Sequence, residues 1–167
     1  PDKEFSTLAY LYTMHPPKHV KPLPNVNIML CDIDCDREVP LTDNASGQDF
    51  MKAMEGWSAI SNNIFVWDYG INFDNYISPF PNFPILQKNI QLFKEHHATM
   101  HFSQIGGSKG GDFPEMRAYM VSKLMWNPYQ DQEKLTGEVL EGYYGAAAPE
   151  LRKYMDISWE IYRKNQL

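Results

Sequence analysis

The chain has 167 residues, which is enough for one domain with a substantial core. Its formal net charge of −6 argues against a nucleic-acid surface, because such a surface needs clustered lysine and arginine and the basic residues here are scattered. No stretch approaches the ~18 apolar residues of a membrane-spanning helix, so we expect no membrane span in this segment and recognise no signal peptide.

Aromatic residues make up 14% of the chain and could provide stacking surfaces for sugar rings as well as filling a core. Cys31 and Cys35 are the only cysteines. On one extended strand they would lie ~13 Å apart, beyond disulfide reach, although a turn after Asp34 could bring them closer. Two thiols without a histidine pair do not form a zinc site, so we expect buried structural cysteines, no metal and no cofactor.

Short apolar runs that end in polar or acidic residues predict four strands. They cover Thr7 to Thr13, Val26 to Ile33, Ile64 to Tyr69 and Thr99 to Gln104. A helix-like stretch follows each of the last three, which is the alternation of a parallel α/β sheet. Ligands bind at the carboxyl ends of such strands, so the polar ends are the candidate site.

Helical periodicity and capping residues predict the helices. Phe50, Met54, Trp57 and Ile60 are spaced three and four residues apart and indicate one amphipathic helix. Later helices are expected to begin near Pro84, at Asp112 through a capping box with Glu115, at Asp131, and at Pro149. Gly145 is expected to end the helix that begins at Asp131.

Two loops stand out between these elements. The segment from Gly70 to Pro84 is long for a compact domain, and such loops are often functional. The segment from Gly106 to Gly111 is expected to be a flexible loop, and it lacks the Lys-Ser/Thr pattern of a phosphate-binding loop. Four parallel strands of this kind form either a small open sheet or half of an eight-stranded barrel.

Five short sequences occur in one order along the chain, namely Leu8-Ala9-Tyr10-Leu11-Tyr12-Thr13, Leu30-Cys31-Asp32-Ile33-Asp34-Cys35, Val66-Trp67-Asp68-Tyr69, Leu124-Met125-Trp126-Asn127-Pro128 and Tyr143-Tyr144-Gly145-Ala146-Ala147. Together they resemble a family of gut-bacterial proteins long labelled a domain of unknown function. That family includes endo-β-N-acetylglucosaminidases that cleave complex N-glycans, and it is similar to the barrels of α-glucuronidases and β-hexosaminidases.

The resemblance implies the C-terminal half, about strands five to eight, of a (β/α)8 TIM-type barrel, with the upstream half in the same polypeptide. Residues 1–128 would hold the last four strands and their helices, and residues 129–167 a helical extension packed on the barrel. A glycan substrate, a substrate-assisted retaining hydrolysis and a secreted, periplasmic or cell-surface location are also implied.

One departure from the family keeps an alternative open. The family often carries Glu-Gln-Gly at the end of the last strand, whereas this chain has Ser103-Gln104-Ile105-Gly106. A role for that glutamate would be vacant here. The alternative is therefore a non-catalytic carbohydrate-binding or structural member of the family.

Asp68 is the first candidate for a catalytic residue, because it lies at a strand end between two aromatic residues that could stack on a sugar. Strand alternation prevents Trp67 and Asp68 from both facing the barrel axis. Because their rings could stack on a sugar face, Trp67 and Tyr69 are candidate substrate-binding residues beside Asp68. The alternative role for Asp68 is to cap a loop or to pair with a nearby arginine.

Asp32 and Asp34 are two residues apart and would face the same way on an extended strand. Two adjacent carboxylates raise one pKa, which suits a general acid, so Asp32 is a second catalytic candidate and Asp34 a binding candidate. In the alternative interpretation, the acidic residues only begin a polar loop. Tyr10 and Tyr12 share one face of the first predicted strand, and Gln104 ends the fourth; all three are candidate sugar-binding residues.

Overall fold

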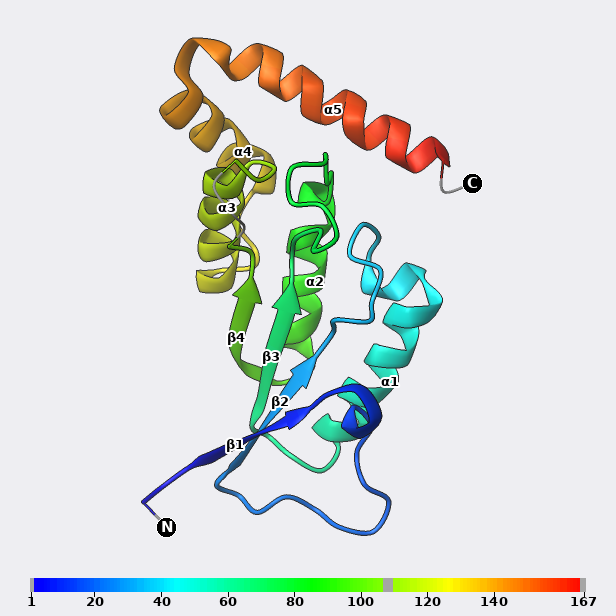
Figure 1. Cartoon of the computed structure of the whole chain (residues 1–167). Helices are drawn as coiled ribbons and strands as arrows, with labels where there is room; N and C mark the ends of the chain where they lie inside the picture. Colours follow the sequence, from blue (N-terminus) through cyan, green and yellow to red (C-terminus); the bar gives the residue numbers. More distant parts are fainter. Residues whose placement is uncertain (1, 107–109, 166–167) are drawn as a thin grey trace. The chain divides into compact units, whose positions relative to one another are not determined.

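The computed structural model describes residues 2–106 and 110–165 and shows an α/β protein (Figure 1). The predicted Gly106–Gly111 loop therefore lies partly outside the described residues. Within the described residues, four parallel strands form a sheet in the order β1-β2-β3-β4, with bounds Phe5–Ala9, Val26–Cys31, Ile64–Tyr69 and Ala98–Gln104. The parallel α/β architecture predicted from the alternating elements is confirmed.

The chain divides into two compact units, and each is described by itself. The first consists of Pro1–Gly70 and Lys88–Gln104, and the second of Ile71–Gln87 and Ile105–Leu167. The predicted division between residues 128 and 129 falls inside the second unit and stays a prediction.

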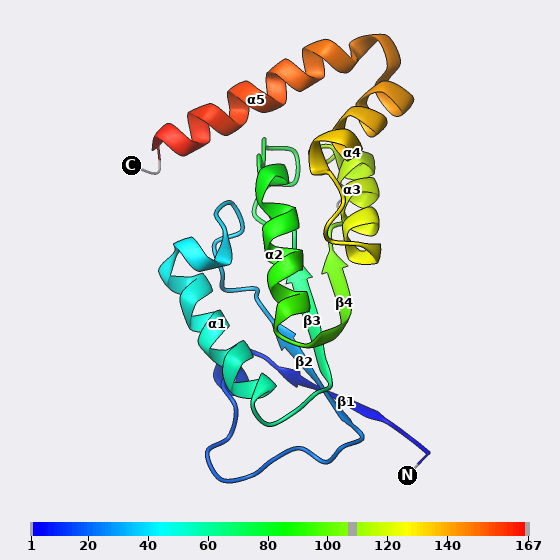
Figure 2. The ribbon, with the colours of Figure 1, turned by 180° about the vertical axis from the view of Figure 1, so that it is seen from behind.

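The first unit contains the sheet, helix α1 (Ala45–Ser58) and most of helix α2 (Phe83–Glu95). Asn44 caps α1, because its side-chain oxygen accepts a hydrogen bond from the Gly47 amide at 2.7 Å. Both helices lie on the same face of the sheet, as the view from behind shows (Figure 2). The register across the sheet places Ile28 opposite Ile64.

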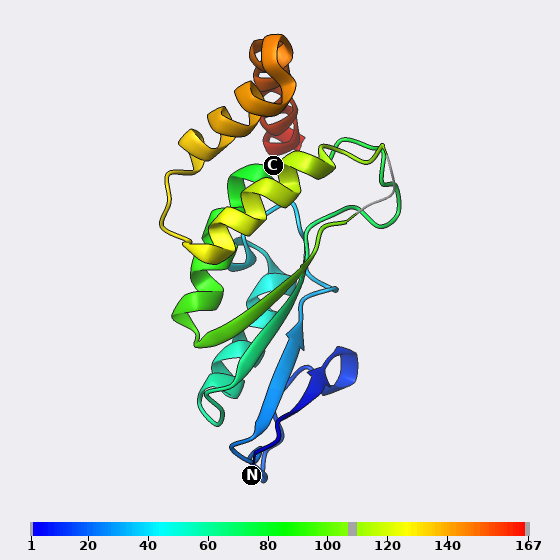
Figure 3. The ribbon, with the colours of Figure 1, turned by 90° about the vertical axis from the view of Figure 1, so that its left-hand side faces the viewer.

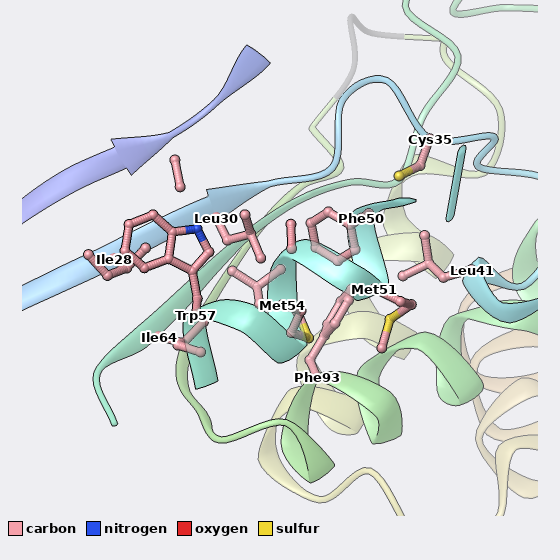
Figure 4. Close-up of a cluster of buried hydrophobic side chains, with 13 residues drawn as sticks. Ile28, Leu30, Cys35, Leu41, Phe50, Met51, Met54, Trp57, Ile64 and Phe93 are labelled. Carbon is pink, nitrogen blue, oxygen red and sulfur yellow. The ribbon is translucent and has the colours of Figure 1, made fainter. Parts of the chain in front are cut away.

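A hydrophobic core fills the space between these helices and the sheet (Figure 4). The predicted helical face of Phe50, Met54 and Trp57 is buried there, and Phe93 joins it from α2. The sheet contributes alternate residues, which are Ala9, Ile28, Leu30, Ile64 and Val66. Every second residue of the strands and every third or fourth residue of α1 therefore point into the same apolar layer.

The opposite face of the sheet is not covered by any helix of the first unit among the residues that the structure describes (Figure 3). Strand alternation turns the remaining side chains toward it, including several large apolar ones. Leu8 is 50% exposed and Met100 and Phe102 are each 45% exposed. We call this surface the open face; its members are Leu8, Met29, Cys31, Phe65, Trp67, Tyr69, Met100, Phe102 and Gln104.

Two strands are shorter than the sequence predicts. The strand expected from Thr7 to Thr13 ends at Ala9, and a short 3₁₀ helix over Leu11–Thr13 follows it. The hydroxyl of Thr13 accepts a hydrogen bond from the Tyr10 amide at 3.1 Å and donates one to the Tyr10 carbonyl at 2.9 Å. These local bonds replace ladder bonds and turn the chain away from the sheet. The second strand ends at Cys31 rather than Ile33.

The second unit is mainly helical, with α3 (Pro114–Trp126), α4 (Gln132–Val139) and α5 (Ala148–Asn165). Asp131 caps α4 as predicted, because its carboxylate accepts a hydrogen bond from the Lys134 amide at 3.1 Å. A π-helix over Leu140–Tyr144 continues α4 and ends at Gly145, whose φ of 55° is a conformation that glycine adopts readily.

The predicted capping box at Asp112 is wrong. Phe113 is the N-cap of α3, with a φ of 47°, and its side chain makes no capping hydrogen bond. The Asp112 carboxylate instead accepts hydrogen bonds from the Arg117 guanidinium and the Phe80 amide, each at 3.2 Å. Arg117 is only 1% exposed, and a buried guanidinium requires this partner more than the helix end requires a cap.

A search of the helices in the described ranges finds none that is long and apolar enough to cross a membrane. That finding agrees with the expectation from the sequence, which contains no long apolar stretch.

Candidate functional site

Two aspartates from neighbouring strands meet at the carboxyl end of the sheet. Asp32 directly follows β2, and Asp68 is the penultimate residue of β3. The strand register, which pairs Cys31 with Trp67, sets the two residues side by side, and each carboxyl group affects the pKa of the other. Asp32 is also fixed by the backbone, because its Oδ1 accepts a hydrogen bond from the Tyr69 amide at 3.2 Å. The two residues named as catalytic candidates are therefore brought together.

The surroundings drive the pKa values of the two carboxyl groups in opposite directions. Burial and the neighbouring charge of Asp68 raise the pKa of Asp32 well above its ordinary value. Burial alone would also raise the pKa of Asp68, but the nearby His101 ring, the hydrogen bond from Ser103 and the neighbouring Asp32 lower it below its ordinary value. As the pH falls, Asp32 therefore takes up a proton before Asp68 does.

His101 and Ser103 of β4 complete this cluster, and sequence reasoning missed both. The Ser103 hydroxyl donates a hydrogen bond to Asp68 Oδ2 at 2.7 Å, and His101 Nε2 lies 3.5 Å from the same oxygen. The His101 ring packs edge-on against Phe93 of α2, with 5.2 Å between ring centroids. The available signal was the register, because Ser103 pairs directly with Asp68 across β3 and β4.

The carboxyl pair lies on the side of the sheet that the helices cover. Asp68 continues the alternation of Ile64 and Val66, which belong to the core, so its side chain points away from the open face. Its side chain keeps 14% exposure, whereas Asp32 is 3% exposed. The argument that Trp67 and Asp68 cannot face the same way is thus confirmed.

The open face carries an aromatic cluster at the same end of the strands. Trp67 and Tyr69 are stacked, with ring centroids 5.8 Å apart and planes 11° apart. The Trp67 indole Nε1 donates a hydrogen bond to Gln104 Oε1 at 3.0 Å, and Phe102 packs edge-on against the indole at 5.1 Å. Three of the predicted sugar-binding residues, Trp67, Tyr69 and Gln104, are therefore adjacent.

Tyr10 and Cys31 lie beside this aromatic cluster. Burial raises the pKa of the Tyr69 hydroxyl, and the nearby Cys31 and Tyr10 raise it further. Burial and the charge of Asp32 also raise the pKa of the Cys31 thiol, to about 11. Both groups therefore stay neutral near pH 7 and interact as hydrogen-bonding groups rather than as charges.

Two predicted positions are not where the sequence placed them. Tyr12 lies in the 3₁₀ helix and is 96% exposed, so it does not share a strand face with Tyr10. Asp34 lies in the turn after β2 and is exposed, because the strand has already ended at Cys31. The predicted pairing of Asp32 and Asp34 on one strand is wrong, and Asp68 takes the place of Asp34.

Cys31 and Cys35 are both buried and free, as expected for structural cysteines. In the part of the chain that the structure describes, no three side chains of the types His, Cys, Asp and Glu are grouped so that they could hold a metal ion. The carboxyl pair can transfer a proton, and the aromatic cluster can stack on a ring.

Fold and site together define an α/β protein with two neighbouring buried carboxyl groups at the carboxyl end of a parallel sheet. Over residues 1–156 the chain matches the family described as "Domain of unknown function (DUF4838)", and it belongs to that family. No curated protein matches the chain, and no solved structure does.

Proposed function

We propose that this chain is part of a glycoside hydrolase that acts on N-acetylhexosamine-containing glycans, such as complex N-glycans. The observation that carries the proposal is the buried pair of Asp32 and Asp68 at the carboxyl ends of the strands, with an aromatic cluster on the opposite face at the same end of the sheet. Glycoside hydrolysis needs a carboxyl group that stays protonated near neutral pH next to one that stays ionised.

The open face supports the further proposal that the chain forms half of a (β/α)8 barrel. Parallel sheets occur almost only with both faces covered, yet this sheet exposes Leu8, Met100 and Phe102 on one face. The four missing strands of a barrel would close over that face and turn it into the barrel interior. In this arrangement the upstream half of the same polypeptide is the partner of the open face.

The aromatic cluster is the proposed sugar-binding wall. The half-buried indole of Trp67, supported by the buried Tyr69 ring, and the exposed Phe102 ring offer an apolar surface to the C–H face of a sugar, and the Gln104 amide next to them can bond a hydroxyl or an acetamido group. Tyr10 and the Tyr69 hydroxyl add neutral hydrogen-bonding groups at the same edge. These groups belong to the half of the pocket that this chain supplies.

The proposed reaction is substrate-assisted and retaining. The 2-acetamido carbonyl oxygen attacks the anomeric carbon while the glycosidic bond breaks, and a carboxyl group of the enzyme donates a proton to the leaving oxygen. Water then opens the cyclic intermediate. Asp68 is the more exposed member of the pair, so the proton of Asp32 would pass to Asp68 as Asp68 protonates the leaving oxygen, and the water that opens the cyclic intermediate would return a proton to the pair.

The test is Asp68→Asn in the full-length protein, with release of the glycan from a complex N-glycoprotein as the readout. We expect a loss of kcat of at least about a hundredfold, because general acid catalysis contributes about 10²–10⁴. Asp34→Asn is the matched control, because Asp34 is an exposed aspartate outside the pair. Unchanged turnover in a folded Asp68→Asn variant would remove Asp68 from the site.

A second candidate function is carbohydrate binding without catalysis. The observation that favours it is the placement of both carboxyl groups on the helix-covered side, away from the aromatic cluster. Binding of glycans by the wild-type protein without any released product would support this function. Absence of both binding and release would instead indicate a structural domain.

The proposed substrate also suggests where the protein acts. N-glycans are carried by secreted and cell-surface glycoproteins, so the enzyme would be secreted, periplasmic or on the cell surface. Fractionation of the native host with an antibody against this chain tests that location, and recovery from the cytoplasm alone would contradict it.

A further inference from the structure

The second unit contains a cleft that is not part of the candidate site described above. Its volume is about 250 Å³, and it lies between the segment Pro79–Pro84, the start of α3 and the helices α4 and α5. All residues that line the cleft belong to the second unit, whereas the aspartate pair and the open face belong to the first.

The size of the cleft limits the ligand. Pockets for drug-sized molecules measure roughly 300–1,000 Å³, so a cleft of about 250 Å³ admits one ring of moderate size rather than an extended molecule.

Several aromatic rings line the cleft. Phe83 begins α2, Phe113 is the N-cap of α3, and Tyr154 and Trp159 belong to α5. The Phe113 ring packs edge-on against Phe83, with 6.1 Å between ring centroids, and at a tilt against Tyr154, with 6.0 Å between centroids. These contacts restrict the motion of the three rings. A rigid aromatic lining of this kind suits a ligand that has an apolar face.

The charged side chains of the cleft are already paired. Arg152 donates hydrogen bonds to Glu133 at 2.7 Å and to Asp156 at 3.0 Å, and Asp112 is held by the buried Arg117. The cleft contains three carboxylates and only one arginine, Arg152, so binding of an anion is disfavoured. The carboxylates already form ion pairs, which reduces their attraction for a cation. Paired ions still present donors and acceptors side by side, as vicinal hydroxyl groups require.

We propose that this cleft binds a single neutral sugar ring, with its apolar face on the aromatic lining and its hydroxyl groups on the Arg152 ion pairs. The further statement that the ring belongs to the glycan substrate rests on the proposed function.

The test measures monosaccharide affinity of the full-length protein by NMR titration with N-acetylglucosamine, galactose and mannose. A Trp67→Ala background removes the aromatic cluster of the open face, so the remaining binding reports on the cleft. In that background Trp159→Ala should weaken binding of at least one sugar by about tenfold, the size expected for loss of one aromatic contact. Trp126→Ala is the control, because Trp126 is 90% exposed and lies outside the cleft.

Arg152→Gln gives a second, milder variant, because Arg152 lies on the rim of the cleft. It should weaken the same sugar while the melting temperature stays close to that of the wild type. Equal affinity in wild-type, Trp159→Ala and Arg152→Gln proteins would overturn the proposal, as would no binding of any of the three sugars. Glycan hydrolysis is scored separately, so an inactive protein whose cleft binds sugar contradicts the proposed function and not this one.

Discussion

The register that pairs Cys31 with Trp67 sets Asp32 beside Asp68 of the neighbouring strand, and the two carboxyl groups have pKa values displaced in opposite directions. Repulsion between two neighbouring buried carboxylates raises the pKa of one of them. Asp32, the more buried group, has the raised pKa, and Asp68 has the lowered one because the Ser103 hydroxyl and the His101 ring lie beside it. This arrangement determines the response to pH and to mutation.

Asp32→Asn should raise the free energy of unfolding at pH 7. Native Asp32 keeps its proton above the ordinary carboxyl pKa of 3.8, whereas the unfolded chain loses it. The native state therefore binds more protons, and stability falls as the pH rises from 3.8 toward the raised pKa. Asparagine is neutral, keeps an oxygen for the Tyr69 amide and keeps a donor for Asp68. Thermal unfolding between pH 4 and 8 should show a higher and flatter profile for the variant.

The dependence of stability on pH can also contradict the prediction for Asp32→Asn. Asp68 contributes with the opposite sign, because its lowered pKa adds stability that is lost as the pH falls from 3.8 through the lowered value. An Asp32→Asn variant that is less stable than the wild type at pH 7, with an unchanged slope, would show that Asp32 is ionised in the native protein.

Asp68→Asn and Ser103→Ala should each destabilise the protein. The Ser103 hydroxyl bonds a charged oxygen at 2.7 Å inside the protein, and such bonds contribute roughly 1.5–3 kcal/mol. Urea unfolding at pH 7 measures the loss. Asp34→Asn, at an exposed turn position, should stay within about 0.5 kcal/mol of the wild type. Equal effects of the Asp34 and Asp68 variants would disprove the buried cluster.

Arg117→Met should be among the most damaging substitutions in the second unit. The buried guanidinium donates to Asp112 and to Asn82, and its charge lies 4.4 Å from the Phe83 ring centroid. Removing one partner of a buried pair leaves an uncompensated charge and costs about 3–5 kcal/mol. Arg163→Met on the exposed side of α5 is the matched control. Calorimetry should resolve the difference, and a mild effect at Arg117 would mean that Asp112 is solvated.

Two glycine substitutions should have opposite effects. A Cβ at Gly47 would collide with the carbonyl oxygen of Leu41, which is backbone and cannot move aside, so Gly47→Ala should cost about 1–3 kcal/mol. At Gly137 in α4 a Cβ meets no atom within 4 Å, and alanine should stabilise the helix by about 0.5–1 kcal/mol. Chemical denaturation of both variants checks the signs, and a stabilising Gly47→Ala would contradict the close approach.

The chain expressed by itself should self-associate through the open face. Leu8, Met100 and Phe102 form part of an exposed apolar surface, and β1 and β4 leave two unpaired strand edges. Light scattering should show dimers or larger species, and Phe102→Ser should shift them toward monomer. Trp126→Ser, which removes an exposed aromatic ring outside the sheet, should have no such effect. A stable, monodisperse wild-type monomer would contradict the prediction.

The sequence by itself determined the α/β class, the four strands and most of the helix positions. These features are local, because they follow from apolar runs, from spacings of three and four such as Phe50–Met54–Trp57, and from caps such as Asp131. Alternation along a single strand was also sufficient to separate Trp67 from Asp68. The local pattern predicted the end of β1 wrongly, because the Thr13 side chain makes hydrogen bonds to the backbone there in place of the bonds between strands.

Only the tertiary structure decided which polar residues meet. The partner of Asp32 could have been Asp34, two residues away, or Asp68, 36 positions along the chain, and strand register selected the second. Register likewise brought His101 and Ser103 to Asp68, and burial of Arg117 drew Asp112 from the helix cap. These choices depend on long-range packing and on the high free energy of an unpaired buried charge, and neither is contained in the pattern of a single segment.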